Sequence, residues 1–183
     1  MELLFSLPLI ILYSIAFGVA MKVADLFNEH GLKERFHGNS MMFGVLCGIF
    51  GGLIVWSDIY LANAAMALML GYIFRLRIDH RNHAVAAVII ITAFLFRGTI
   101  DLPTIIFFFL TFAIFGGIRD YLDDTLHSKS GIQKIFEAGW YLIIPPLIYS
   151  YFTGHWLVSL FLILFIVSYD VVKYVWEKPM INA

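Results

Sequence analysis

The sequence predicts an all-α, polytopic integral membrane protein, a bundle of about seven transmembrane helices. Of its 183 residues, 61% are hydrophobic and 14% are Asp, Glu, Lys or Arg, against about 45–50% and about 25% in soluble domains. The mean hydropathy is +0.88, and 18 residues are Phe. A chain this short has too little interior to bury so much apolar surface. We therefore expect residues 1–183 to form a single transmembrane domain that faces lipid.

Charge and cysteine content narrow the classes of partner. The net charge is −1, so the chain lacks the basic excess that nucleic-acid binding requires, and we expect no nucleic-acid partner. Cys47 is the single cysteine, so no intrachain disulfide can form. The expected partners are membrane lipids, and a homo-oligomer is left open.

Seven apolar segments approach the length of about 20 residues, range about 17–25, that spans a bilayer core. The first has no positively charged n-region and no small-residue cleavage site, so we expect a retained span rather than a signal peptide. Only Ser57 and Asp58 separate the second from the third, which predicts a tight helical hairpin. The predicted spans are 3–21, 41–56, 59–74, 84–96, 102–118, 140–152 and 156–175.

The later spans are interrupted by Gly and Pro. Gly98, Asp101 and Pro103 separate the fourth span from the fifth. Pro145 and Pro146 remove two backbone donors from the sixth, which we expect to be kinked. The fourth and sixth segments have only 13 residues each, so re-entrant or tilted segments are alternatives to full spans.

The distribution of Lys and Arg predicts the orientation. Eleven of the 12 basic residues fall in the loops after the first, third and fifth spans or near the C-terminus, and Arg97 is the exception. Positive charge in short loops stays on the cytoplasmic side. The sequence therefore predicts a multi-pass protein of the cell membrane with its N-terminus outside and its C-terminus inside.

The chain matches itself weakly at an offset of 65 residues. This offset relates the second span to the fifth, so the related elements would run in opposite directions, as in the inverted repeats of many transporters and channels. Chance matches of common residues are the alternative. The matched residues are Ile49, Phe50, Gly51, Gly52, Asp58 and Leu61 with Ile114, Phe115, Gly116, Gly117, Asp123 and Leu126.

The pattern of three plus three plus one helices, with glycine-rich second and fifth spans, is loosely similar to trimeric intracellular cation channels. The chain departs from that family in its long polar first loop and lacks the full Gly-Gly-Gly and Arg-Asp pattern in both halves.

Small residues predict close helix packing. Glycines recur every fourth residue from Gly44 to Gly52 and form one face of the second span. Asn63 and Gly71 belong to a matching small face on the third span. We expect these faces to pair, with Asn63 bonding across the pair. The alternative is that Gly51 and Gly52 form a hinge or line a site for an ion or substrate.

Acidic groups at helical spacing predict a cation site on the inner face. In the first loop, Asp25 shares a helical face with Asn28 and Glu29 if the helix continues. After the fifth span, Asp120 shares a face with Asp124 in the same way. Mg²⁺ prefers such oxygen ligands and often binds substrate phosphates as well. The predicted ligands are Asp25, Asn28, Asp120 and Asp124.

Basic residues and imidazoles lie between these acidic clusters. Arginine offers bidentate contacts to phosphate, and histidines at i and i+3 can bind a metal or transfer protons. The alternative is that the arginines only set the orientation and the carboxylates are their ion-pair partners. The predicted catalytic residues are His80 and His83, and the predicted substrate-binding residues are Arg75, Arg77, Asn82 and Arg119.

The layout is similar to that of UbiA-type prenyltransferases, in which two Asp-rich cytoplasmic motifs four helices apart hold a Mg²⁺-diphosphate. Here Asp25 and Asn28 lie four spans before Asp120 and Asp124. The chain departs from that family because it is far shorter, has seven rather than nine predicted spans and lacks the extended Asn/Asp repeat.

The expected function is that of a membrane enzyme, such as a transferase, acting on a lipid or polyprenyl phosphate at the cytoplasmic face with Mg²⁺. The alternative is a small inverted-repeat channel or transporter that depends on Gly51, Gly52, Gly116 and Gly117, where the enzyme hypothesis predicts that Ala is tolerated. A non-catalytic partner subunit is a third hypothesis.

Asp170 is either paired with Lys173 or faces a site within the membrane.

Overall fold

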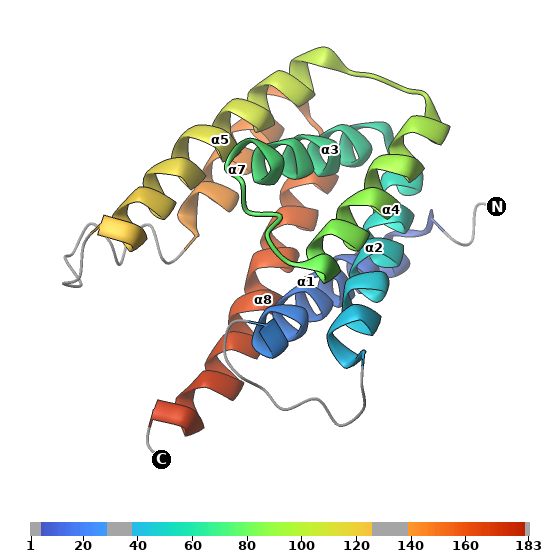
Figure 1. Ribbon diagram of the computed structural model, residues 1–183. Helices are drawn as coiled ribbons and strands as arrows, with labels where there is room; N and C mark the ends of the chain where they lie inside the picture. Colours follow the sequence, from blue (N-terminus) through green and yellow to red (C-terminus); the bar gives the residue numbers. More distant parts are fainter. Residues whose placement is uncertain (1–4, 29–37, 126–138, 182–183) are drawn as a thin grey trace.

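The computed structural model describes residues 5–28, 38–125 and 139–181, and these residues form helices and connecting turns without a strand. The prediction of an all-α protein is confirmed (Figure 1). The elements are α1 (Leu7–Asn28), α2 (Asn39–Ser57), α3 (Ile59–Phe74), α4 (Arg81–Arg97), α5 (Leu102–Thr125), the 3₁₀ turn η2 (Trp140–Leu142), α7 (Ile144–Thr153) and α8 (Trp156–Ile181).

Four helices are long and apolar enough to cross a membrane: Leu7–Asn28, Asn39–Ser57, Leu102–Leu122 and Trp156–Trp176. α3 is also apolar but has only 16 residues. The outward face of α5 carries Ile106, Leu110 and Ile114, each about half exposed. Apolar residues on the outside of long apolar helices indicate a membrane protein.

Aspartates and glycines set the helix boundaries at one end of the bundle. The Asp58 side chain accepts hydrogen bonds from the backbone N–H groups of Tyr60 (2.8 Å) and Leu61 (3.1 Å), which caps α3. Asp101 accepts from the backbone N–H of Thr104 at 3.0 Å and starts α5 in the same way. Gly98 ends α4 with φ of 68°, a left-handed conformation that glycine adopts without strain. The predicted breaks at Asp58, Gly98 and Asp101 therefore have capping roles.

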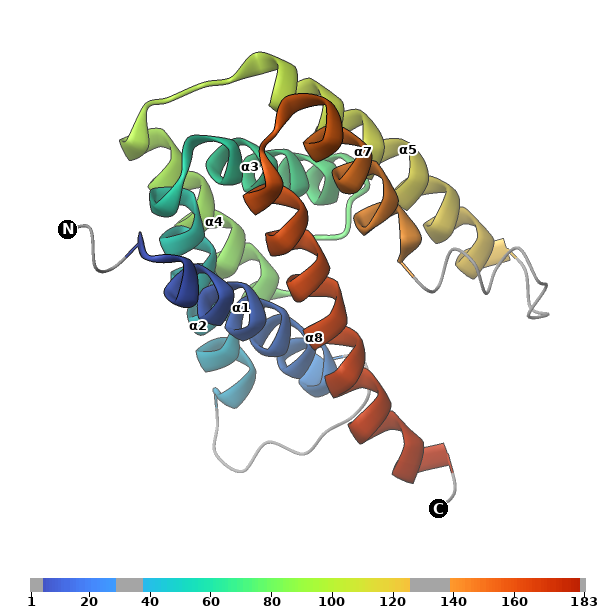
Figure 2. The same ribbon diagram turned by 180° about the vertical axis from the view of Figure 1, so that it is seen from behind.

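The predicted pairing of the glycine face of α2 with α3 is wrong. α2 packs most extensively against α4 and then α1, whereas α3 packs most extensively against α5. Figures 1 and 2 show α3 turning away from α2 after the link at Asp58. Asp58 is in an extended conformation (φ −153°, ψ 151°), and this redirects the chain instead of folding α3 back along α2.

The small residues pack against partners other than those predicted. A Cβ at Gly44 would lie 2.5 Å from the backbone oxygen of Asn82 in α4, and one at Gly71 would lie 2.9 Å from Phe112 Cβ in α5. Asn63 does not bond to α2; its amide group donates to Ile59 O (2.7 Å) and Thr99 O (3.3 Å). The sequence predicted close packing at these small residues. The observed partner of α2 is α4, and the observed partner of α3 is α5.

The proline pair begins a helix and does not kink one. Pro145 and Pro146 occupy the first turn of α7, where missing N–H groups leave no intrahelical bond unmade. The expected kink within the sixth span is therefore corrected to a 3₁₀ turn followed by a helix of 10 residues. At about 1.5 Å per residue such a helix is about half as long as a bilayer core of about 30 Å.

The helix contacts give no support to an inverted repeat. Its two halves would relate α1 and α2 to α4 and α5, yet α1 packs extensively on α2 while α4 and α5 barely touch. A Cβ at Gly51 would meet Ile90 of α4, whereas one at the matched Gly116 would meet the Arg75 guanidinium after α3. Asp123 and Leu126 of the proposed match lie where the structure describes no side chain.

α8 joins two groups of helices (Figure 2). It packs along α1, which itself contacts α2, and it also contacts α3 and α7. Gly18 of α1 lies directly against Ser168 and the Phe165 carbonyl of α8, so no side chain fits between the two helices. Phe17 and Phe165 pack at 5.0 Å between ring centroids beside this crossing.

The packing of α2 against α4 predicts opposite effects for two alanine substitutions on the same face. Gly44→Ala places a methyl group against the Asn82 backbone, which we expect to destabilise the protein by about 1–3 kcal/mol. Gly52→Ala places it 3.6 Å from Ala93 Cβ, an ordinary contact, and alanine favours a helix over glycine by about 1 kcal/mol. Thermal unfolding in detergent should give a lower Tm for G44A and an unchanged or higher Tm for G52A; equal shifts would contradict the described helix pair.

Candidate functional site

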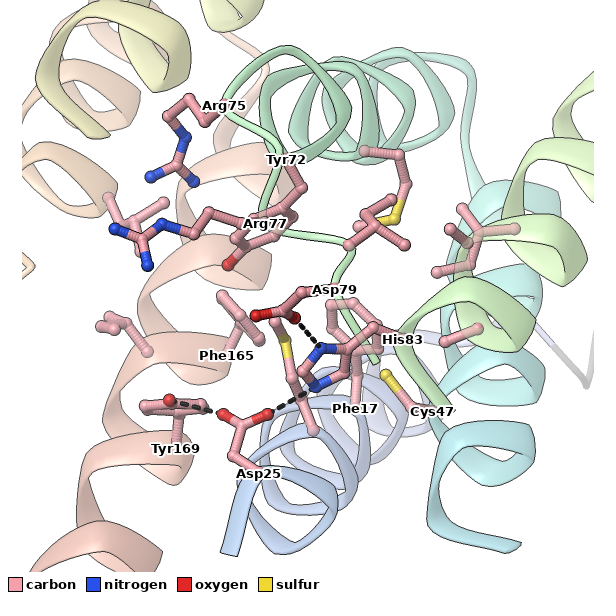
Figure 3. Close-up of a pocket in the computed structure, with 18 of the residues that line it drawn as sticks. Phe17, Asp25, Cys47, Tyr72, Arg75, Arg77, Asp79, His83, Phe165 and Tyr169 are labelled. Carbon is pink, nitrogen blue, oxygen red and sulfur yellow. Dashed lines mark hydrogen bonds and ion pairs between the residues drawn. The ribbon is translucent and has the colours of Figure 1, made fainter. Parts of the chain in front are cut away.

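A cavity of about 280 Å³ lies where α1, α3 and α5 approach their C-terminal ends and α4 begins. Its apolar wall includes Phe17, Met21, Met69, Ile90 and Phe165. Figure 3 shows the charged side chains that converge on it from several elements. The polar lining residues are Asp25, Tyr72, Arg75, Arg77, Asp79, His83, Arg119, Asp120, Tyr141 and Tyr169.

Asp25 is the centre of a hydrogen-bonded chain across the cavity (Figure 3). Its carboxylate lies 2.7 Å from His83 Nε2 and accepts a hydrogen bond of 2.7 Å from the Tyr169 hydroxyl. His83 Nδ1 lies 3.6 Å from Asp79 Oδ1. The exposed side-chain fraction falls from 51% at Asp79 to 15% at His83 and 6% at Asp25. The two hydrogen bonds therefore centre on a buried carboxylate, and the ion pair with Asp79 extends the series to an exposed one.

Lys22 adds a buried positive charge next to this chain. It is 2% exposed, and its Nζ lies 5.2 Å from the ring centroid of Tyr169. A cation over an aromatic face is attracted to the ring quadrupole. Lys22 therefore packs on the same tyrosine whose hydroxyl binds Asp25.

Two arginines share one carboxylate oxygen. Asp120 Oδ2 accepts from Arg75 Nη1 at 2.8 Å and lies 3.1 Å from Arg77 Nε. Arg75 is 6% exposed, whereas Arg77 is 38% exposed. The Arg75 guanidinium also lies 5.0 Å from the ring centroid of Tyr72. Arg75 is thus fixed in the wall of the cavity, and Arg77 reaches it from the more open side.

The turn after α3 brings both arginines to Asp120. Leu76 has φ of 58°, and the N–H groups of Leu76 and Arg77 donate to Ile73 O and Tyr72 O, each at 3.0 Å. This is the Schellman pattern of helix termination, which usually has glycine in the left-handed position. The 85% exposed Leu76 side chain points away from the bundle, while those of Arg75 and Arg77 meet Asp120.

Gly116 provides the space for Arg75. A Cβ at Gly116 would lie 2.6 Å from the guanidinium carbon, whereas one at Gly117 would meet nothing within 4 Å. The enzyme hypothesis predicts that Ala is tolerated at all four paired glycines. This prediction is corrected at Gly116, because a methyl group there would displace Arg75 from the cavity wall.

Six of the predicted site residues line the same cavity although they come from distant parts of the chain. Arg119 lies beside Asp120 on α5 and is hydrogen-bonded to Tyr141. The six are Asp25, Arg75, Arg77, His83, Arg119 and Asp120.

The remaining predicted site residues do not line the cavity or are not described. His80 lies outside it, with its ring centroid 5.8 Å from that of His83. Asn82 bridges helices, donating to Ala24 O at 3.3 Å and accepting from the His83 N–H at 2.8 Å. Asn28 accepts from Ser40 Oγ at 2.9 Å. Glu29 and the Asp124 side chain lie outside the described residues.

The described residues do not fit a preassembled magnesium site. Both oxygens of Asp25 are engaged by His83 and Tyr169, and Asp120 is paired with two arginines. Within the described part of the chain, no three His, Cys, Asp or Glu residues lie close enough together to hold a metal ion. Magnesium dependence stays a prediction.

Sequence reasoning missed Asp79 as a site residue, as well as Tyr169 and Lys22. Tyr169 had a detectable signal, since a tyrosine in an otherwise apolar helix needs a partner for its hydroxyl. It directly precedes Asp170, which the sequence singled out. Asp170 itself does not belong to the cavity lining.

An apolar layer separates the cavity from the polar groups at the other end of the bundle. Along α3, α5 and α8, this second polar set includes Asn63, Thr104 and Ser159. Between these residues and the cavity the three helices carry mostly buried apolar side chains. Thr111 of α5 is a buried polar residue at the same level, and its hydroxyl donates to Phe107 O at 2.8 Å. The layer contains Leu68, Phe108, Phe112, Phe161 and Leu162.

No protein-family model matches the chain, and comparison with curated proteins and with solved structures gives no significant match.

The left-handed residue after α3 predicts a stabilising substitution. An L-residue in this conformation costs about 1–2 kcal/mol relative to glycine, and Leu76 makes little use of its exposed side chain. We expect Leu76→Gly to raise the free energy of unfolding by about 1 kcal/mol, part of the gain being lost to the greater freedom of glycine in the unfolded chain. Leu76→Ala is the control, because alanine keeps the strain; equal stability of the two variants would contradict the described turn.

Proposed function

We propose that this protein is a multi-pass integral membrane enzyme that acts on a lipid or polyprenyl phosphate at the cytoplasmic face of the cell membrane. The observation that carries the proposal is the convergence of three arginines and an Asp25–His83 pair on one cavity. Guanidinium groups bind phosphate, and a carboxylate-paired imidazole moves protons.

The arginines supply the binding chemistry. Arg75 and Arg77 already direct two N–H groups at a single oxygen of Asp120, which is how two guanidiniums hold one oxygen of a phosphate. An incoming phosphate competes with Asp120 for Arg77, the more exposed of the two. Arg75 stays in place because Tyr72, the Gly71 carbonyl and Gly116 surround it.

His83 supplies the proton transfer. Its two ring nitrogens face Asp25 and Asp79, so the imidazole can take up a proton at one nitrogen and release one at the other. In the proposed reaction the attacking hydroxyl group loses its proton to His83 as its oxygen bonds to phosphorus. The leaving oxygen receives a proton from His83 as its bond to phosphorus breaks, so the imidazole returns to its starting protonation state. The arginines neutralise the charge that develops on the phosphate oxygens.

The cavity walls suit an amphiphilic substrate. Polar residues lie at its mouth and along one side, and Phe17, Met21, Ile90 and Phe165 supply an apolar surface. A lipid can therefore place its phosphate among the arginines while apolar atoms stay against the aromatic wall. The channel or transporter alternative gains less support, because the layer beyond the cavity consists mostly of buried apolar side chains, with Thr111 as a polar residue within it.

Binding of lipid phosphates should depend on Arg77. We expect Arg77→Gln to weaken binding about tenfold, because one charge-assisted hydrogen bond is lost. Arg81→Gln is the matched control, since Arg81 is an exposed arginine four residues away that does not line the cavity. Titration of purified protein with dihexanoyl phosphatidic acid, farnesyl phosphate and a short-chain phosphodiester lipid, with and without Mg²⁺, measures this. Equal affinities of R77Q and R81Q for every lipid would overturn the proposal.

Turnover should depend on His83 and not on His80. We expect His83→Asn to slow conversion of the bound lipid about 10²–10⁴-fold, the usual contribution of a general acid or base. His80→Asn leaves the cavity lining unchanged and should keep the rate. Phosphorus NMR of the lipid headgroup follows the reaction, and a thermal melt of each variant verifies folding. A folded H83N variant with the wild-type rate would remove His83 from the mechanism.

A further inference from the structure

The charges of the cavity are balanced in number and separated in space. Among the described lining residues there are three guanidinium and three carboxylate groups. Figure 3 shows Arg75 and Arg77 on one side of the cavity. The linked side chains of Asp79, His83, Asp25 and Tyr169 lie on the other side. Asp120 belongs to the arginine side, where it neutralises only part of the positive charge. The cavity therefore has a positive and a negative pole.

A dipolar cavity discriminates between anions and zwitterions. A phosphate monoester brings a net negative charge beside Asp25 and Asp79, and in surroundings of low dielectric constant an unbalanced charge is costly. A ligand with one negative and one positive group leaves the balance unchanged and can pair both of its charges. We infer that the cavity binds a zwitterionic headgroup, a phosphodiester with a primary ammonium group of the phosphoethanolamine type.

The acceptors at the negative pole favour a primary ammonium group. The imidazole nitrogens nearest to Asp79 lie 3.6 Å (His83) and 3.9 Å (His80) from its oxygens, both beyond hydrogen-bond distance. Asp25 accepts two hydrogen bonds, fewer than a carboxylate can accept. An ammonium with three N–H donors can bond to these oxygens, whereas a quaternary ammonium has no donor.

The other charged groups around this pole do not remove the polarity. Lys22 does not line the cavity, but its Nζ lies over the ring of Tyr169, which binds Asp25, so Lys22 offsets part of the charge of Asp25 and leaves Asp79 as the more strongly negative group. Arg119, which also lines the cavity, hydrogen-bonds to Tyr141 of η2. The acidic pole thus keeps two carboxylates that face the cavity, Asp25 and Asp79. This inference rests on the proposed function, since it names the headgroup that the phosphate site would take.

The test compares headgroups on wild type, Asp79→Asn and Arg77→Gln. Asp79 is half exposed, so D79N should fold, and Asp170→Asn serves as a carboxylate control outside the cavity. The ligands are the dihexanoyl forms of phosphatidylethanolamine, phosphatidylcholine and phosphatidic acid. Water-soluble glycerophosphoethanolamine, which keeps the phosphodiester and the ammonium group, separates a lipid from its free headgroup. Dissociation constants are measured on the full chain in detergent.

We expect wild type to bind the ethanolamine lipid about tenfold more tightly than the choline lipid. D79N should lose this preference and bind phosphatidic acid more tightly than wild type does, because one of the carboxylates that repel the anion is neutralised. R77Q should weaken all three lipids. If free glycerophosphoethanolamine binds as tightly as the lipid, the zwitterion site is confirmed and its ligand is a soluble phosphodiester. Arg77-dependent binding without an ethanolamine preference would overturn the inference and leave the proposed function standing. If no phosphate lipid binds in a way that depends on Arg77, both the inference and the proposed function are overturned.

Discussion

The pairing of buried charges governs how the helices meet at the end of the bundle that contains the cavity. An ionised group that is packed between apolar helices is tolerated only with a partner at hydrogen-bond distance. Asp120 on α5 meets this requirement through Arg75 and Arg77, which ties the end of α3 to α5. Asp25 on α1 meets it through His83 of α4 and Tyr169 of α8. Together these two carboxylates connect five helices around one cavity, so the site and the helix packing depend on the same bonds.

Close backbone approach between helices makes these bonds geometrically accessible. Gly44 lets α2 come against the backbone of Asn82, and the Asn82 amide donates to the Ala24 carbonyl of α1. Asn82 directly precedes His83, and Ala24 directly precedes Asp25. The hydrogen bond between Asn82 and Ala24 therefore also holds His83 close to Asp25. Gly116 acts in the same way for Arg75. The small residues therefore serve the site indirectly, by setting distances between the helices that carry its charged groups.

The sequence predicted helix positions well and helix partners poorly. Apolar run length, together with breaks at Asp58, Gly98 and Asp101, is local information, and each predicted span overlaps an observed helix. The glycine face of α2 indicated that some helix would approach closely, but α3 and α4 both offer small residues, and only the extended backbone at Asp58 decides between them. Six site residues were identified because charge is conspicuous in an apolar chain. The Asp25–Tyr169 bond joins residues 144 positions apart, and no local pattern encodes such a contact.

The brevity of several helices has a consequence for the surrounding bilayer. α3, α4 and α7 have 16, 17 and 10 residues, or about 24, 26 and 15 Å at 1.5 Å per residue, while the hydrocarbon core is about 30 Å thick. If helices this short cross the bilayer, thinning of the membrane around them is one way to match the two lengths. Lipid headgroups would then sink toward the ends of α3 and α4, the level at which Arg75, Arg77 and His83 lie. Hydrophobic mismatch would thus bring the polar part of a lipid to the cavity without removing its chains from the membrane.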